Sequence, residues 1–366
     1  MSQCRGKCPD PAVQVNQYGR VLEPELRAED LLSGPRGREL CAQLAGLAPP
    51  RAGVLLVPVP GPAGARLPGR AEPPGRDDEA QPPSLLPDRD DPLAVIAALA
   101  DVAGDAGYWG GPPAADPLGH PDVLAELRPV AARLAGSAGC RWWWSGLDRR
   151  AQRYVQWTAR QPAPELGHAA GMLRAAGADA DEDERRMSRD RHLPAGSGVN
   201  GPWWTCPPVL STTRRLGRLG AVLLAGREDG FGDTDAVVWP LAVAGTARVL
   251  EVDGPQAWQR LVAAYPRPAT ATYRHTWAWT GWDGEWLVPR WPAVARHWDG
   301  VHLSVAGYLS TAGRALPAGT ARTLLAGWNP DETYWLTDVL TPGGQARAWH
   351  SHDRTPLGWQ EVTPTA

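Results

Sequence analysis

The chain contains few cysteines and no long apolar run. Its five cysteines are scattered over 366 residues, and only Cys4 and Cys8 lie close together. An odd, scattered set does not make a disulfide framework, and no histidine stands near this pair to complete a zinc site. No apolar stretch approaches the ~20 residues that cross a bilayer, and the N-terminus lacks the apolar core of a signal peptide. We therefore expect a soluble, cytoplasmic protein with no membrane partner and no metal ion.

The sequence also lacks a strong charge of either sign and the common cofactor motifs. Its formal net charge is −3, which gives no electrostatic reason to expect nucleic acid as a partner. It contains no P-loop, no GxGxxG after a strand, no HExxH, no GxSxG and no paired CxxC. These absences predict no cofactor, and they leave a small molecule or another protein as the partner.

Composition and periodicity divide the chain into six segments. Residues 48–90 are rich in Pro, Gly, Arg and Asp and contain no aromatic residue, which is typical of a linker. Within them, only residues 54–57 are apolar enough to add a strand to a sheet edge. Residues 91–195 have helical spacing and predict four helices, of which the third includes residues 147–155. The segments are a flexible arm (1–27), a docking helix from about Pro35 (28–47), the linker (48–90), a helical domain (91–195), an α+β domain (196–341) and a tail (342–366).

The apolar spacing changes period in a regular order between residues 247 and 305. Residues 247–253 predict a strand, and the helical spacing of the next stretch, bounded by Pro255 and Pro266, predicts a helix. Residues 270–279 alternate and are followed by a turn and a second short strand, which predicts a hairpin. Residues 290–298 return to helical spacing, and residues 301–305 alternate again.

The resulting order is strand, helix, strand, strand, helix, strand, which is that of a split β-α-β unit. We therefore predict an α+β fold. In this fold a helical N-terminal region precedes a sheet-centred C-terminal domain with a split β-α-β (βαββαβ) core.

Three stretches resemble a group of proteins from high-GC actinobacteria. They are LLSGPRGRELC near the start, RWWWSGLDRRAQRYVQW in the middle, and DGEWLVPRWPAVARHWDGVHLSVAGYL with LAGWNPDETYWLTDV near the end. The abundance of Ala, Gly, Pro and Arg, with a single Lys and a single Phe, fits such a genome. The resemblance implies a cytosolic bacterial protein and carries over no catalytic residue.

The sharpest local pattern is VHLSV at residues 301–305. On a strand, His302 and Ser304 project from one face and Val301, Leu303 and Val305 from the other. A His and a hydroxyl placed in this way could act around a phosphate, as in two-histidine phosphoesterases, but the chain has no second His-x-Ser/Thr strand. A histidine hydrogen-bonded at a sheet surface is the alternative interpretation.

A second candidate set consists of Arg274, His275, Tyr308 and Glu332. An arginine could hold a phosphate, a tyrosine could stack on a base or a nicotinamide, and a glutamate could stabilise an oxocarbenium ion. These are the residue types of an ADP-ribosyltransferase-like site, although His302 and Tyr308 are closer in sequence than that site requires.

Trp279, Trp282 and Trp286 lie at the end of the predicted hairpin, where burial in a core is difficult. An aromatic wall for a planar ligand or a sugar is therefore an alternative to packing, and His275 joins these three as a candidate ligand-binding residue.

Two functions stay open. The first is a binding or regulatory protein that recognises a small planar or sugar-containing ligand, or a protein partner, through the Trp-rich C-terminal domain. The second is an enzyme acting on a nucleotide or NAD-like substrate, with His302 as acid/base, Ser304 and Arg274 at a phosphate, and Tyr308 as a stacking group. The second requires that these side chains converge within about 10 Å.

Overall fold

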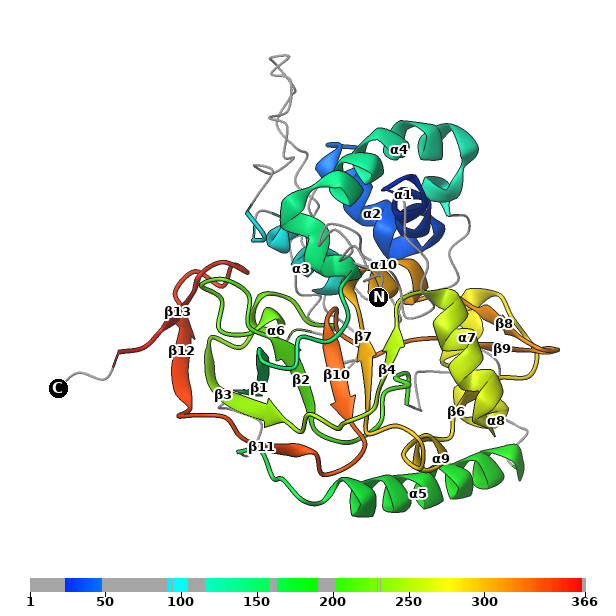
Figure 1. The fold of residues 1–366 in the computed structure, drawn as a ribbon. Helices are drawn as coiled ribbons and strands as arrows, with labels where there is room; N and C mark the ends of the chain where they lie inside the picture. Colours follow the sequence, from blue (N-terminus) through cyan, green and yellow to red (C-terminus); the bar gives the residue numbers. More distant parts are fainter. Residues whose placement is uncertain are drawn as a thin grey trace, which may run out of the picture.

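The computed structural model describes residues 24–47, 91–93, 95–104, 116–157, 163–189, 202–228, 230 and 232–363. Most of the predicted arm and linker, including the predicted edge strand at 54–57, lies outside the described residues. The described part is an α+β fold, as predicted, with helices mainly in its N-terminal region and a mixed sheet built mainly from its C-terminal region (Figure 1).

Helices occur in three groups along the chain. The first group is α1 (Pro24–Ser33), α2 (Pro35–Leu44), α3 (Ile96–Gly104), η1 (Pro117–Gly119), α4 (Pro121–Gly136) and η2 (Ala138–Trp144). The second is α5 (Ala169–Arg189) and α6 (Val222–Ala225). The third is α7 (Pro255–Ala264), α8 (Thr270–Tyr273), η3 (Trp277–Thr280), α9 (Trp291–Val294) and α10 (Val305–Thr311).

One large sheet joins distant parts of the sequence. Its nine strands are β1 (Gln152–Trp157), β2 (Ser211–Arg214), β3 (Asp235–Val243), β4 (Val249–Val252), β7 (Gly300–Leu303), β10 (Glu332–Trp335), β11 (Leu340–Pro342), β12 (Arg347–Ser351) and β13 (Trp359–Glu361). The order is β13-β12-β3-β1-β2-β10-β7-β4, and β11 also pairs with β3. The neighbours β4 and β7 are parallel, and the other pairs of this sheet are antiparallel. Two hairpin-like pairs stand apart from it, namely β5 (Pro266–Pro268) with β6 (Leu287–Pro289) and β8 (Leu316–Ala318) with β9 (Ala321–Thr323).

Helices α1, α2 and α4 gather beyond one end of the central strands, and α10 connects them to the sheet (Figure 1). Two glycines make this contact close. A Cβ atom at Gly34, between α1 and α2, would lie 2.3 Å from the Leu309 carbonyl oxygen of α10. A Cβ atom at Gly307 of α10 would lie 2.2 Å from the Val252 carbonyl oxygen of β4. Backbone thus meets backbone on both sides of α10, which leaves no room for a side chain at either position.

The predicted element order between residues 247 and 305 is present only in part, because the predicted hairpin is absent. Strands β4, β6 and β7 and helices α7 and α9 lie close to their predicted positions, and the short strand β5 follows α7. Residues 270–279, predicted as a strand, instead form α8 and the start of η3, and the β5–β6 pair lies outside the sheet that contains β4 and β7. The reason is visible in the aromatic spacing. Tyr273 and Trp277 are four residues apart and stack at 4.0 Å, a contact that helical spacing allows and strand alternation does not.

Other segments also differ from their predicted type. Residues 152–157, predicted within a helix, form β1 and pair with β3 on one side and β2 on the other. The predicted boundary near residue 195 therefore falls between two strands that pair with each other. Residues 342–366, predicted as a tail, contribute β12 and β13 to the sheet. In the N-terminal part, α2 begins at Pro35 as predicted, whereas residues 24–33 form the additional helix α1.

Candidate functional site

Four charged side chains lie side by side on four neighbouring strands. In the order of the sheet they are Glu251 on β4, His302 on β7, Asp331 immediately before β10, and Arg214 at the end of β2. The register pairs Glu251 with His302, His302 with Thr333, and Thr333 with Thr212. Because residues two apart on a strand share a face, Glu251, His302 and Arg214 project from the same face. The contacts of Asp331 with His302 and Arg214 place its carboxylate on that face as well. We call these four residues the charge ladder.

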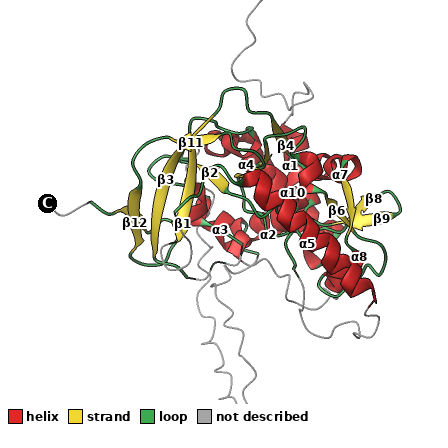
Figure 2. Cartoon of the chain, turned by 90° about the horizontal axis from the view of Figure 1, so that it is seen from below, coloured by secondary structure: helices red, strands yellow, loops and turns green. Residues whose placement is uncertain are grey.

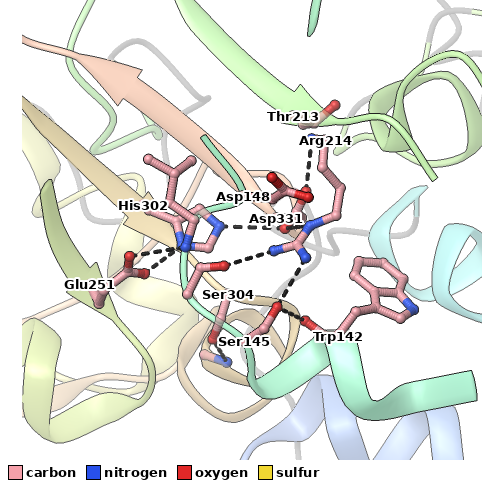
Figure 3. Close-up of polar contacts among 12 residues, drawn as sticks. Trp142, Ser145, Asp148, Thr213, Arg214, Glu251, His302, Ser304 and Asp331 are labelled. Carbon is pink, nitrogen blue, oxygen red and sulfur yellow. Dashed lines mark hydrogen bonds and ion pairs between the residues drawn. The ribbon is translucent and has the colours of Figure 1, made fainter. Parts of the chain in front are cut away.

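The members of the charge ladder contact one another in sequence (Figure 3). Nδ1 of His302 lies 2.5 Å from Oε2 of Glu251, and its Nε2 lies 3.4 Å from Oδ1 of Asp331. Nε of Arg214 donates to the same Oδ1 at 2.6 Å, and the backbone N–H of Arg214 donates to Oδ2 at 2.9 Å. Asp331 holds this position with a positive φ of 64°, a conformation that Asp tolerates better than most residues.

The ladder contains two positive and two negative charges at neutral pH. Burial alone would lower the pKa of His302, but the carboxylates of Glu251 and Asp331 outweigh burial and raise this pKa to about 9. Burial would raise the pKa of Glu251, which the charge of His302 instead holds below its usual value. Burial would also raise the pKa of Asp331, but the positive charge of Arg214, more than any other group, lowers it. His302 is therefore an imidazolium that donates from both ring nitrogens, so neither nitrogen is free to accept a proton from a substrate.

The segment that follows η2 crosses the charge ladder. Arg214 donates to the Ser145 hydroxyl at 2.9 Å and to the Gly146 carbonyl oxygen at 3.1 Å, and the backbone N–H of Leu147 donates to Glu251 at 3.0 Å. Under this segment the side chains of Arg214, His302 and Asp331 are 8%, 1% and 1% exposed, whereas that of Glu251 is 22% exposed. Solvent therefore reaches the ladder at Glu251.

Ser304 and Tyr308 do not join the ladder. Strand β7 ends at Leu303, and the Ser304 hydroxyl accepts a hydrogen bond from the backbone N–H of Gly307 at 3.0 Å, which caps the start of α10. The Tyr308 hydroxyl donates to Glu228 at 2.9 Å and is fully buried. The predicted pairing of His302 with Ser304 on one strand face is therefore absent, because the strand stops one residue too early.

Glu332 belongs to a different polar cluster. It pairs with Leu303 in the sheet and so points away from the face that carries His302. Its carboxylate accepts from the Ser211 hydroxyl at 2.7 Å and from the backbone and side chain of Asn329, each at 2.9 Å. Burial raises the pKa of Glu332. The predicted residues His302, Ser304, Tyr308 and Glu332 thus end in separate contacts and do not form one site.

The remaining predicted residues lie in a second region, which we call the aromatic lobe and define as residues 203–204 and 266–289. Its centre is formed by Tyr273, Trp277 and Trp286, with Trp277 stacked on Tyr273 and packed edge-on against Trp286 at 4.8 Å. Trp286 is fully buried and packs in this centre, so it does not contribute to an exposed wall.

Four other tryptophans belong to the lobe. Trp203, Trp279 and Trp282 are half-buried and pack against it, and Trp204 is 45% exposed. The backbone of residues 203–204 is held in place because its carbonyl oxygens accept hydrogen bonds from Trp277 at 3.2 Å and from Tyr273 at 2.8 Å. Arg322 lies 4.9 Å from the ring centre of Trp282. Trp279 and Trp282 thus lie at the margin of the lobe, and Trp286 does not.

Helix α5 fixes the start of the helical turn that carries Arg274 and His275. The carboxylate of Glu184 accepts from the backbone N–H groups of Ala271 and Thr272 at 2.9 and 2.8 Å, and from the Thr272 hydroxyl at 2.7 Å. Figure 2 shows α5 running alongside α8. Glu184 belongs to the charged run DEDERR at residues 181–186 of α5.

No protein-family model, curated protein or solved structure matches this chain. The resemblance to actinobacterial proteins therefore stays a prediction. Among the residues that the structure describes, no helix is long and apolar enough to cross a membrane. The same residues contain no group of three or more His, Cys, Asp or Glu side chains placed to hold a metal ion.

Proposed function

We propose that this is a binding or regulatory protein that recognises a small planar or sugar-containing ligand, or a protein partner, through the aromatic lobe. The observation that carries the proposal is the concentration of tryptophans in the lobe outside its buried centre, where Trp203, Trp279 and Trp282 are half-buried and Trp204 is exposed. Tryptophan faces stack on planar rings and sugars, and exposed tryptophans are enriched where proteins bind partners. The contacts of His302, Ser304 and Tyr308 support the same view, because each of these side chains is hydrogen-bonded to another group of the protein and so is not free to act on a substrate.

A panel of nucleotides, sugars and aromatic metabolites tests this proposal by intrinsic tryptophan fluorescence. We expect at least one compound to change the emission, and we expect Trp204→Ala or Trp279→Ala to weaken its binding at least about tenfold, as loss of an aromatic hot spot does. Trp298→Ala is the matched control, since Trp298 is also half-buried but packs on the main core outside the lobe. The proposal fails if no compound perturbs the emission and if Trp282→Ala retains every partner in a pull-down.

An enzyme acting on a nucleotide or NAD-like substrate is the second candidate, and the exposure of Glu251 is the observation that favours it. Glu251 is the ladder member that solvent reaches, and His302 and the Leu147 N–H orient its carboxylate. Such a reaction would use Glu251 as the acting carboxylate, with His302 and Asp331 behind it as positioning residues. We expect Glu251→Gln to reduce turnover of NAD or of a nucleotide phosphoester at least about a hundredfold, the usual contribution of a general base. Trp204→Ala should leave that turnover unchanged, and absence of turnover in the unaltered protein rejects this candidate.

A further inference from the structure

Helix α5 lies along the surface, below the sheet in the view of Figure 1, and buries almost nothing. It has 21 residues, of which Leu173, in its second turn, is the one that is buried. Helix α7 has 10 residues and buries Trp258, Leu261 and Val262 together with two smaller residues. A helix in water is only marginally stable unless an apolar face packs against the rest of the protein. The part of α5 beyond Leu173 is therefore held in place by other contacts.

Among the described residues, polar contacts at three positions join the C-terminal part of α5, residues 177–189, to the rest of the protein. Asp181 accepts a hydrogen bond from Arg290 at 2.9 Å, and the carbonyl oxygen of Ala180 accepts one from Arg267 at 3.4 Å. Glu184 accepts the three hydrogen bonds from the start of α8 that are described above. The side chains of Asp181 and Arg290 are 40% and 41% exposed, so solvent weakens this ion pair.

Gly177 stands at the boundary between two differently held parts of α5. On its N-terminal side, Leu173 packs in the main core, and Asp338 accepts a hydrogen bond from the N–H of Ala169 at 3.1 Å. A Cβ atom at Gly177 would lie 2.9 Å from Cγ of Pro292, so glycine allows α5 to pass close to α9. Glycine is also a poor helix former. The helix is therefore weakest where its anchored N-terminal part meets the part that polar contacts hold.

The contact through Glu184 joins α5 to the backbone of the aromatic lobe. Glu184 fixes the start of α8, and Tyr273 is the last residue of α8. The Tyr273 hydroxyl donates to the carbonyl oxygen of Trp204 at 2.8 Å, and its ring stacks on Trp277. Trp277 in turn donates to the carbonyl oxygen of Trp203 at 3.2 Å. A displacement of α8 would therefore reach the segment that carries Trp203 and Trp204.

From these observations we infer that residues 177–189 of α5 are a detachable strap. The strap leaves α8 in a local opening while the rest of the protein stays folded, and its departure loosens α8 and residues 203–204 of the lobe. Segments with few buried apolar contacts open locally at a much lower free energy than global unfolding requires. As a means of regulation the strap rests on the proposed function, since only a lobe that binds a ligand has binding to regulate.

Hydrogen–deuterium exchange of the full chain, followed by mass spectrometry of its peptides, tests this inference. In the unaltered protein we expect the amides of residues 181–189 to exchange at least about a hundredfold faster than those of residues 259–264 in α7, because the strap opens without global unfolding. The N–H groups of Tyr273 and Arg274 donate to carbonyl oxygens at the start of α8 and report whether that helix is formed. Glu184→Ala should make them exchange at least about tenfold faster, because it removes hydrogen bonds to a charged group.

Glu182→Ala is the matched control for Glu184→Ala. Glu182 lies in the same part of α5, is exposed, and forms an ion pair with Arg185 of the same helix. The two substitutions change helix propensity equally, so the control should leave exchange in α8 unchanged.

Equal exchange in residues 181–189 and in α7 would show that α5 does not open locally. Equal exchange in α8 for the Glu184 and Glu182 variants would show that the strap is not coupled to the lobe. Either result overturns the inference. Because the exchange measurements need no ligand, they are separate from the test of the proposed function. The compound panel can fail while α5 opens as described, and it can succeed while α5 stays closed.

Discussion

Arg214→Met is expected to destabilise the protein by about 3–5 kcal/mol, the usual result of removing one partner from a buried ion pair. Without Arg214, the charge ladder holds two carboxylates and one cation, and the carboxylate of Asp331 is buried. The variant also loses hydrogen bonds to the Ser145 hydroxyl and the Gly146 carbonyl oxygen, which attach the segment after η2 to the sheet. Urea unfolding monitored by circular dichroism measures the loss of free energy of unfolding.

Two further variants test whether the loss of stability comes from removing the charge of Arg214. Arg215→Met is the matched control, since Arg215 is the next residue, is exposed, and should change stability by less than about 0.5 kcal/mol. Combining Arg214→Met with Asp331→Asn returns the ladder to one cation and one anion, and Asn tolerates the positive φ at this position. We therefore expect the double variant to be more stable than Arg214→Met alone. Equal losses for Arg214→Met and Arg215→Met would show that the ladder does not contribute as described.

His302→Gln is expected to remove a pH dependence of stability that the unaltered protein has between about pH 6.5 and pH 9. The pKa of His302 is about 9 in the folded protein and 6.5 without its surroundings. A raised pKa means that the folded state binds the proton more tightly. Protonated His302 therefore stabilises the folded state fully below pH 6.5, and this contribution is lost as pH rises through 9. This shift corresponds to about 3 kcal/mol at most.

The measurement is the free energy of unfolding in urea, at constant ionic strength, across this pH window. Burial raises the pKa of Asp30 to about 6 and the thiol pKa values of Cys41 and Cys140 to about 12 from an ordinary 9, so these three groups titrate outside the window. We expect stability to fall with rising pH in the unaltered protein and in the control His297→Gln, an exposed histidine, and to stay nearly level in His302→Gln. Parallel curves for all three proteins would rule out His302 as the source.

The sequence predicted secondary structure well where apolar spacing was unambiguous and poorly where aromatic residues allow two periods. Helices α2 and α7 lie where their patterns placed them. The alternation at residues 270–279 was misleading, because Tyr273 and Trp277 fit both a strand face and a helical face. The choice depends on contacts far away in sequence, such as the Glu184 cap on α8.

The charge ladder could be predicted only in part. His302 was singled out because a histidine stood between apolar residues of a strand. Glu251 carries the same signal, a charge inside a short apolar strand, and that signal could have been used. Arg214 is one of several arginines in the run TRRLGR, and Asp331 lies in a turn, so neither pattern distinguishes a buried charge from a solvated one. Arg214 and Asp331 come into contact because β10 pairs with both β2 and β7, and the order of elements along the chain does not specify this pairing.

The position of β1 has a consequence for how the chain folds. Strand β1 lies between β3 and β2, and β12 reaches β3 from near the C-terminus, so the sheet forms only after segments far apart along the chain have met. Such high contact order is associated with slow folding, because the entropy of closing long loops is lost before the contacts form. A fragment that starts after β1 would lack the strand between β3 and β2. The edges of β3 and β2 that pair with β1 would then have unpaired N–H and C=O groups. These open edges would favour pairing between molecules, so synthesis of the C-terminal part by itself should yield aggregates rather than a smaller folded unit.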